Sequence, residues 1–121
     1  MNTLEKDFIP YEPSLALKEL GFDEPCICGY SKSNEKLEIY SRFLVTKDSF
    51  TVDAPTFSQA FRFFREKYDM PCNLELLEDG WDYVIYMDIE EEIDLGEGPF
   101  TTYEEAELAC LIKLIEIVKN K

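Results

Sequence analysis

The sequence predicts an α+β fold, a two-layer sandwich in which one four-stranded antiparallel sheet carries helices on one face, in the order α-ββα-ββα. Three observations predict it. Two segments combine helical spacing of apolar side chains with capping-box residues, two pairs of extended stretches flank turn signals, and the chain aligns with itself at a shift of 46 residues. A length of 121 residues with 45% hydrophobic content suffices for one core, so we expect a single domain over residues 1–121.

The first segment, PSLALKELGF at residues 13–22, is expected to form a short helix. Proline is favoured in the first turn, where Pro13 stands, and Leu17 and Leu20 fall on one face. Gly21 then acts as a stop signal, because glycine readily adopts the left-handed conformation that ends helices.

Residues 26–30 (CICGY) and 37–45 (LEIYSRFLV) flank the polar sequence SKSNEK and are expected to form a β-hairpin. Side chains in the second stretch alternate between two faces. Ile39 is therefore expected on the buried face and Tyr40 on the opposite one.

Residues 56–68 (TFSQAFRFFREKY) predict an amphipathic helix that begins at a capping box of Thr56 and Gln59. Arg62 and Arg65 flank its apolar stripe, and we interpret them as a solvated polar face and not as contacts to nucleic acid. The stripe consists of Phe57, Ala60, Phe61, Phe64 and Tyr68.

A second hairpin is expected to pair residues 72–77 with residues 81–89. The dipeptide Asp79-Gly80 between them is typical of a tight two-residue turn. The acidic sequence that follows, up to Gly98, is interpreted as a loop.

The last helix is expected to begin at the capping box of Thr102 and Glu105 and to run to the end of the chain. Its apolar residues cover more than half of its circumference. We therefore expect it to contact both the sheet and a second neighbour.

An internal repeat relates residues 23–67 to residues 69–113, with nine identities in the ungapped register. The two hairpins, the two capping boxes and the two helices coincide in this alignment. A module of this length does not bury its apolar face alone, so two copies are expected to share one core.

Three residues are candidates for binding a partner, namely Tyr40, Val84 and Tyr86. Each is expected to point away from the helix-covered face of the sheet. An exposed apolar patch on an otherwise wet sheet face suggests a protein partner or a second subunit.

Four acidic residues, Asp88, Glu90, Glu92 and Asp94, are weak candidates for a metal site, because the residue pattern of a calcium loop is missing around them. The cysteines do not have the spacing of a zinc knuckle and are interpreted as small core thiols. Histidine is absent, which excludes mechanisms that need it. We nominate no catalytic residue and no cofactor.

Charge is the most unusual property of the chain. The net charge is −14, and no Lys or Arg occurs between Lys67 and Lys113, where 14 Asp and Glu residues fall. Such a surface repels nucleic acid and anionic lipid and favours encounter with basic proteins. The N-terminal sequence has no apolar run, and no stretch of the chain is long and apolar enough to span a bilayer, so we expect a cytoplasmic protein.

Four strings, IPYEPSLALKELGFDEPC, FRFFREKYDM, WDY and FTTYEEAELACLIKLIEIVK, resemble a group of small uncharacterised proteins carried by prophages and mobile elements of gut anaerobic bacteria. The likeness covers most of the chain from Ile9 onward. The order of helix, hairpin and helix is more distantly similar to phage alpha-beta-alpha sandwich domains. The resemblance implies no catalytic residue.

Three hypotheses about function follow. The first is a non-enzymatic accessory protein of phage type that binds a basic protein, in its sharpest form a nucleic-acid mimic that occupies the basic cleft of a host enzyme. The second is a metal-dependent binder or enzyme that uses the acidic cluster at residues 88–97. The third is a structural homodimer.

Overall fold

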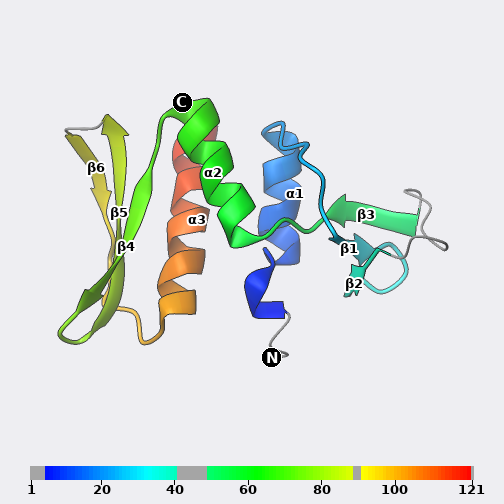
Figure 1. The fold of residues 1–121 in the computed structure, drawn as a ribbon, viewed down its shortest axis with the longest axis horizontal. Helices are drawn as coiled ribbons and strands as arrows, with labels where there is room; N and C mark the ends of the chain where they lie inside the picture. Colours follow the sequence, from blue (N-terminus) through cyan, green and yellow to red (C-terminus); the bar gives the residue numbers. More distant parts are fainter. Residues whose placement is uncertain (1–4, 41–48, 89–90, 121) are drawn as a thin grey trace. The chain divides into compact units, whose positions relative to one another are not determined.

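The computed structural model describes residues 5–40, 49–88 and 91–120, and these form an α+β protein with three α-helices and two small antiparallel sheets (Figure 1). The contacts divide the chain into two compact units, Met1–Gln59 (unit 1) and Ala60–Lys121 (unit 2). Each unit is described by itself.

Unit 1 contains one α-helix packed against a three-stranded sheet of strand order β2-β1-β3, in which β1 is central and antiparallel to both neighbours. Its elements are the 3-10 helix η1 (Glu5–Asp7), α1 (Tyr11–Glu19), β1 (Cys28–Ser31), β2 (Leu37–Ile39), β3 (Phe50–Asp53) and the first residues of α2 (Phe57–Tyr68).

Helix α1 ends where the sequence predicts it. Gly21 has a φ of 99° in the left-handed region, and the amide of Phe22 donates to the Leu17 carbonyl at 3.0 Å. This bond satisfies a carbonyl group that the last turn would otherwise leave unpaired.

The core of unit 1 lies between β1, β3 and the segment before α1. Phe8 and Val52 are buried in it together with Tyr30 from the central strand. The Tyr30 hydroxyl donates to the Ile9 carbonyl at 2.7 Å, and the Ser14 hydroxyl donates to the same carbonyl at 3.1 Å. Because buried polar groups cost free energy when unpaired, these bonds allow a phenol and a serine to lie inside the core.

Unit 2 contains a second three-stranded sheet, of strand order β4-β5-β6, in which β5 is central. Register pairs Leu77 with Gly80, so the turn between β4 and β5 is the predicted tight hairpin. The remaining elements of the unit are the rest of α2, β4 (Cys72–Leu77), β5 (Gly80–Asp88), β6 (Glu91–Leu95) and α3 (Tyr103–Lys119).

Helix α3 packs against β4 and β5, as Figure 1 shows and as the sequence predicts. It begins at Thr102, whose side chain accepts a hydrogen bond from the Glu105 amide at 3.1 Å. Its other faces are half-buried or exposed, and Ile112 is 48% exposed. The residues buried along α3 are Ala106, Cys110, Leu111, Leu114 and Ile115.

Helix α2 begins with a complete capping box. The Gln59 amide donates to the Thr56 hydroxyl at 3.2 Å, and the Thr56 amide donates to the Gln59 side-chain oxygen at 2.9 Å. The sequence predicted this pair, and the reciprocal bonds satisfy two amides at the start of the helix.

The prediction of one four-stranded sheet is wrong for the described residues. Strands β1, β2 and β3 pair among themselves, and so do β4, β5 and β6. The sequence did not predict β3 or β6. Each of these strands adds a third strand to the hairpin in the same half of the chain. Each half therefore completes a sheet of its own.

The structure does not confirm the predicted internal repeat, although some element boundaries coincide in the alignment. Helices α2 and α3 begin at Phe57 and Tyr103, which the shift of 46 residues aligns. However, the first strand is central in unit 1, whereas the second strand is central in unit 2. The two halves are thus not two copies of the same strand order.

The burial of two side chains also differs from the prediction. Ile39, expected in the core, is 59% exposed because β2 is a short edge strand. Val84, expected in solvent, is 5% exposed because it lies in the central strand β5 between Asn73 and Leu95. Ile85 is fully buried, as predicted.

Among the helices of the described residues, none is long and apolar enough to cross a membrane.

Candidate functional site

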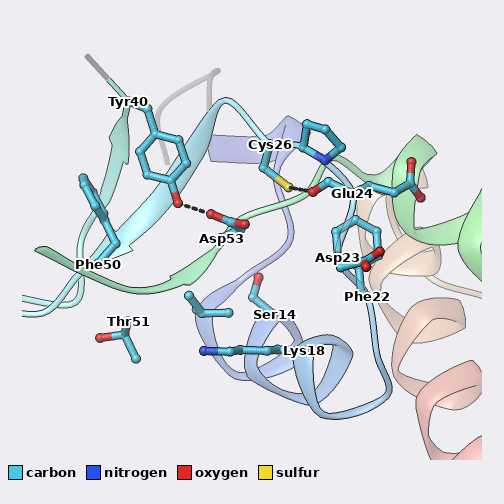
Figure 2. Close-up of a pocket in the computed structure, with 12 residues that line it drawn as sticks. Ser14, Lys18, Phe22, Asp23, Glu24, Cys26, Tyr40, Phe50, Thr51 and Asp53 are labelled. Atoms are coloured by element: carbon cyan, nitrogen blue, oxygen red, sulfur yellow. Dashed lines mark hydrogen bonds between the residues drawn. The ribbon is translucent and has the colours of Figure 1, made fainter. Parts of the chain in front are cut away.

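A cavity with a volume of about 620 Å³ lies in unit 1 (Figure 2). We call it the Tyr40 cavity. It is lined by residues of α1, the segment after α1, and β3. The polar residues that matter for its chemistry are Lys18, Asp23, Glu24, Cys26, Tyr40 and Asp53.

Strand register brings Tyr40 and Asp53 together. Gly29 of the central strand β1 pairs with Glu38 on one side and with Asp53 on the other, so the residue that follows β2 can reach across β1 to the end of β3. The Tyr40 hydroxyl donates a hydrogen bond to the Asp53 carboxylate, and Figure 2 shows this bond at the cavity wall. The Tyr40 ring also packs edge-on against Phe50, with the ring centroids 4.7 Å apart.

Gly29 makes this arrangement sterically accessible. A Cβ atom at position 29 would clash with the hydroxyl and ring carbons of Tyr40. Only glycine therefore lets the phenol lie directly over the central strand. Neither Gly29 nor Asp53 was a candidate from the sequence.

Burial keeps two cavity side chains in their neutral forms. The pKa of Tyr40 is raised, first by burial and then by its hydrogen bond to Asp53. Burial and the nearby Asp53 carboxylate raise the pKa of the Cys26 thiol to about 12, and this thiol donates to the Glu24 carbonyl at 3.4 Å. The cavity thus combines neutral donors and aromatic walls with three carboxylates and one lysine, which suits binding of a positively charged group.

A second candidate site is the tip of the β4–β5 hairpin in unit 2. Leu76 is 70% exposed and Leu77 is 41% exposed. Glu75, Glu78 and Asp79 beside them are also exposed. We call these five residues the hairpin surface.

An aromatic pair lies next to the hairpin surface. Trp81 is the cross-strand partner of Leu76 and packs edge-on against Tyr103, with the ring centroids 5.0 Å apart. Tyr103 is 40% exposed. The sequence signal that could have revealed this surface is the pair of adjacent leucines in CNLELLEDG, since consecutive apolar residues in a strand cannot both face the core.

The partner-binding candidates fall in different units. Tyr40 is half-buried in the wall of the cavity of unit 1. Val84 and Tyr86 lie on β5 of unit 2, where Val84 is buried and Tyr86 is half-buried. Their role in binding a partner stays a prediction.

The metal candidates are only partly covered by the structure. Glu90 lies outside the described residues, and Asp88, Glu92 and Asp94 are placed as backbone positions of β5 and β6. The predicted acidic loop is therefore in part a strand. Within the described residues, no group of three or more His, Cys, Asp or Glu residues is arranged to hold a metal ion.

The cysteines are less uniform than the prediction of four core thiols. Cys28 and Cys110 are fully buried, whereas Cys26 and Cys72 are half-buried. None of the four is in a disulfide.

Comparison of the chain with known proteins finds no match. No protein-family model matches the chain, and neither a curated protein nor a solved structure gives a match. The resemblance to phage and mobile-element proteins stays a prediction.

Proposed function

We propose that the protein is a small acidic interaction protein that binds a basic partner protein through the hairpin surface. The observation that supports this most directly is the presence of two exposed leucines beside three exposed carboxylates, on an edge strand and in the turn that follows it. Large apolar side chains exposed together on a surface are typical of binding sites. The lack of Lys and Arg between Lys67 and Lys113 gives the surface a single sign of charge.

The position of β4 suggests how the partner binds. Among the described strands, β4 pairs only with β5, so it is an edge of its sheet. The outer backbone groups of an edge strand can accept an additional strand from another chain. Side chains of a strand alternate between its two faces, so Leu76 lies on one face of β4 and Glu75 on the other. An extended segment that alternates basic and apolar side chains would place its apolar side chains on the face of Leu76 and its basic side chains on the face of Glu75.

The two kinds of side chain contribute differently. Full burial of a leucine side chain is worth about 1.5–3 kcal/mol, whereas an exposed ion pair contributes about 0.2–1 kcal/mol. Leu76 and Leu77 are therefore expected to supply most of the affinity. The carboxylates are expected to speed association and to select for positive charge.

A fluorescence titration tests this function. Trp81 is the only tryptophan of the chain and lies opposite Leu76, so its emission reports on the hairpin directly. The probe is a short synthetic peptide of alternating lysine and valine, and the matched control peptide alternates glutamate and valine. We expect saturable changes with the lysine peptide alone.

Two double variants separate site-specific binding from general attraction to a polycation. Glu75→Lys/Glu78→Lys reverses charge on the hairpin surface, and Glu38→Lys/Glu66→Lys makes the same change of net charge at other exposed positions. The first is expected to weaken binding about tenfold and the second to change it little. Equal weakening by both variants would contradict the proposal.

The Tyr40 cavity favours a second candidate function, binding of a small organic cation. Its volume of about 620 Å³ is in the usual range for ligand sites, and Asp53 lies beside the aromatic ring of Tyr40. Calorimetry with spermidine and arginine, with citrate as the anionic control, tests it. Asp53→Asn should abolish any heat of binding and Asp7→Asn, an exposed residue of η1, should not.

The remaining proposals are supported by the sequence alone. Nucleic-acid mimicry is supported by the net charge and predicts capture of a basic protein that is lost at high salt. A metal-dependent role for residues 88–97 predicts thermal stabilisation by a divalent cation. A homodimer predicts a dimer mass in light scattering, and a phage-type origin is supported by the resemblance.

A further inference from the structure

Cys72 and Cys110 lie side by side within unit 2. Cys72 is the first residue of β4 and pairs with Ile85 of the central strand. Cys110 lies on the buried face of α3, the helix that packs against both of these strands. The two thiols are within hydrogen-bonding distance of each other.

The two thiols differ in burial, and the pKa of Cys72 is lowered by its neighbours. Cys110 is fully buried, whereas Cys72 is half-buried and is therefore in part exposed to solvent. The hydrogen bond from Cys110 lowers the pKa of Cys72, and the nearby Arg65 guanidinium lowers it further, against the opposing effects of burial and Glu107. A thiolate with a cation beside it is the form of cysteine that reacts with oxidants.

We propose that Cys72 and Cys110 form an oxidisable thiol pair that reacts with hydroperoxides. The Cys72 thiolate attacks one oxygen of hydrogen peroxide, the O–O bond breaks, and with one proton from solvent the products are Cys72 sulfenic acid and water. The Cys110 sulfur then attacks the Cys72 sulfur and displaces the hydroxyl group as a second water molecule. Two thiols and one peroxide thus give one disulfide and two waters, and a thiol reductant reverses the change.

This chemistry would join β4 to α3 covalently. Cys26 and Cys28 provide an internal comparison, because burial raises the pKa of both thiols. Neither is expected to react at neutral pH. The proposal does not depend on what the hairpin surface binds, since Cys72 and Leu77 lie at opposite ends of β4.

The test is peptide mapping of the whole chain after treatment with one equivalent of hydrogen peroxide at neutral pH. We expect a peptide pair joined through Cys72 and Cys110 with the mass of two hydrogens lost, and its disappearance on reduction. Cys26 and Cys28 should remain thiols. A link between any other pair, or unchanged thiols at positions 72 and 110, would overturn the proposal.

A variant tests the order of the two steps. In Cys110→Ser the sulfenic acid has no second thiol to attack it, so dimedone should label Cys72 several-fold more than in the wild type. Cys28→Ser, which removes another buried thiol of the chain, should leave the Cys72–Cys110 link unchanged. Dimedone labelling that stays at the wild-type level in Cys110→Ser would contradict the assignment of Cys72 as the reacting thiol.

Discussion

At the scale of single residues, the position of Tyr40 in the cavity wall depends on Gly29, which has no side chain. Gly29 leaves the space in which Tyr40 reaches Asp53. The alternation of residues 37–40 indicates that Tyr40 lies on a different face from Ile39, but it contains no information on which residue of a neighbouring strand lies beside it. Strand pairing decides that, and the pairing partner β3 was not anticipated from the sequence.

Gly29→Ala is predicted to disrupt the cavity. The added methyl group would displace the Tyr40 ring, remove its hydrogen bond to Asp53 and destabilise the protein by about 1–3 kcal/mol, the usual cost of overpacking. Urea unfolding measures the stability. Tyr40→Phe, which removes only the hydroxyl, should cost about 1 kcal/mol. An alanine variant as stable as the wild type would show that the ring is not held over position 29.

Buried phenols and thiols predict a loss of stability at alkaline pH. Burial raises the pKa of Tyr30 to about 12 from an ordinary value of 10.0, and the pKa values of Tyr40 and Cys26 are raised as well. The folded protein therefore holds protons that the unfolded chain has released. The stability that these protonated groups contribute is complete below their pKa in the unfolded chain. It is lost as the pH rises through their pKa in the folded protein.

For Tyr30 the window lies between about pH 10 and about pH 12. The free energy of unfolding, measured with urea at several pH values, should fall across it. Tyr30→Phe, which has no titrating group at this position, should lose less stability over the same range. A wild-type free energy that stays constant or rises would contradict the assigned burial of these groups.

At the scale of elements, helices were predicted better than strands. The signals of a helix are local, since a cap and a periodic stripe lie within a few residues of each other. Thr56 and Thr102 accordingly start α2 and α3 as predicted. Strand β6, in contrast, has the sequence EEIDL, whose acidic residues are uncommon in strands, and its place beside β5 depends on pairing.

The cap of α3 can be tested with adjacent threonines. Thr102 accepts a hydrogen bond from the Glu105 amide, whereas the neighbouring Thr101 is exposed and precedes the cap. Thr102→Ala should destabilise the protein by about 1 kcal/mol, the usual cost of losing an N-cap. Thr101→Ala should change stability by less than about 0.5 kcal/mol. Equal effects in thermal or urea unfolding would argue against the cap.

At the scale of the whole molecule, the repeated sequence does not give a repeated topology. In the alignment at 46 residues, β1 overlaps β4, β2 overlaps β5 and α2 overlaps α3. The alignment did not indicate that β1 takes the central position in one sheet and β5 in the other. Alternation of side chains indicates which residues of a strand share a face, but not which strand has two neighbours, so the number of sheets could not be derived from it.

Features of the candidate sites that depend on local sequence were predicted, whereas features that depend on strand pairing were not. The charge of the second half is a property of the sequence and was available from it. The exposure of Leu76 and the burial of Val84 are consequences of edge and central positions in the sheet. The contact between Cys72 and Cys110 joins residues far apart in the chain, and no local pattern indicates it.

Binding of a basic partner at the hairpin surface is tested most directly by amide chemical shifts, measured during titration with the lysine-valine peptide. We expect the largest and saturable shifts to be confined to the amides of β4, its turn and Trp81, and Leu76→Ser to abolish most of them. Shifts of similar size spread over acidic residues of both units would contradict binding at this surface, because they would indicate attraction by net charge without a defined site.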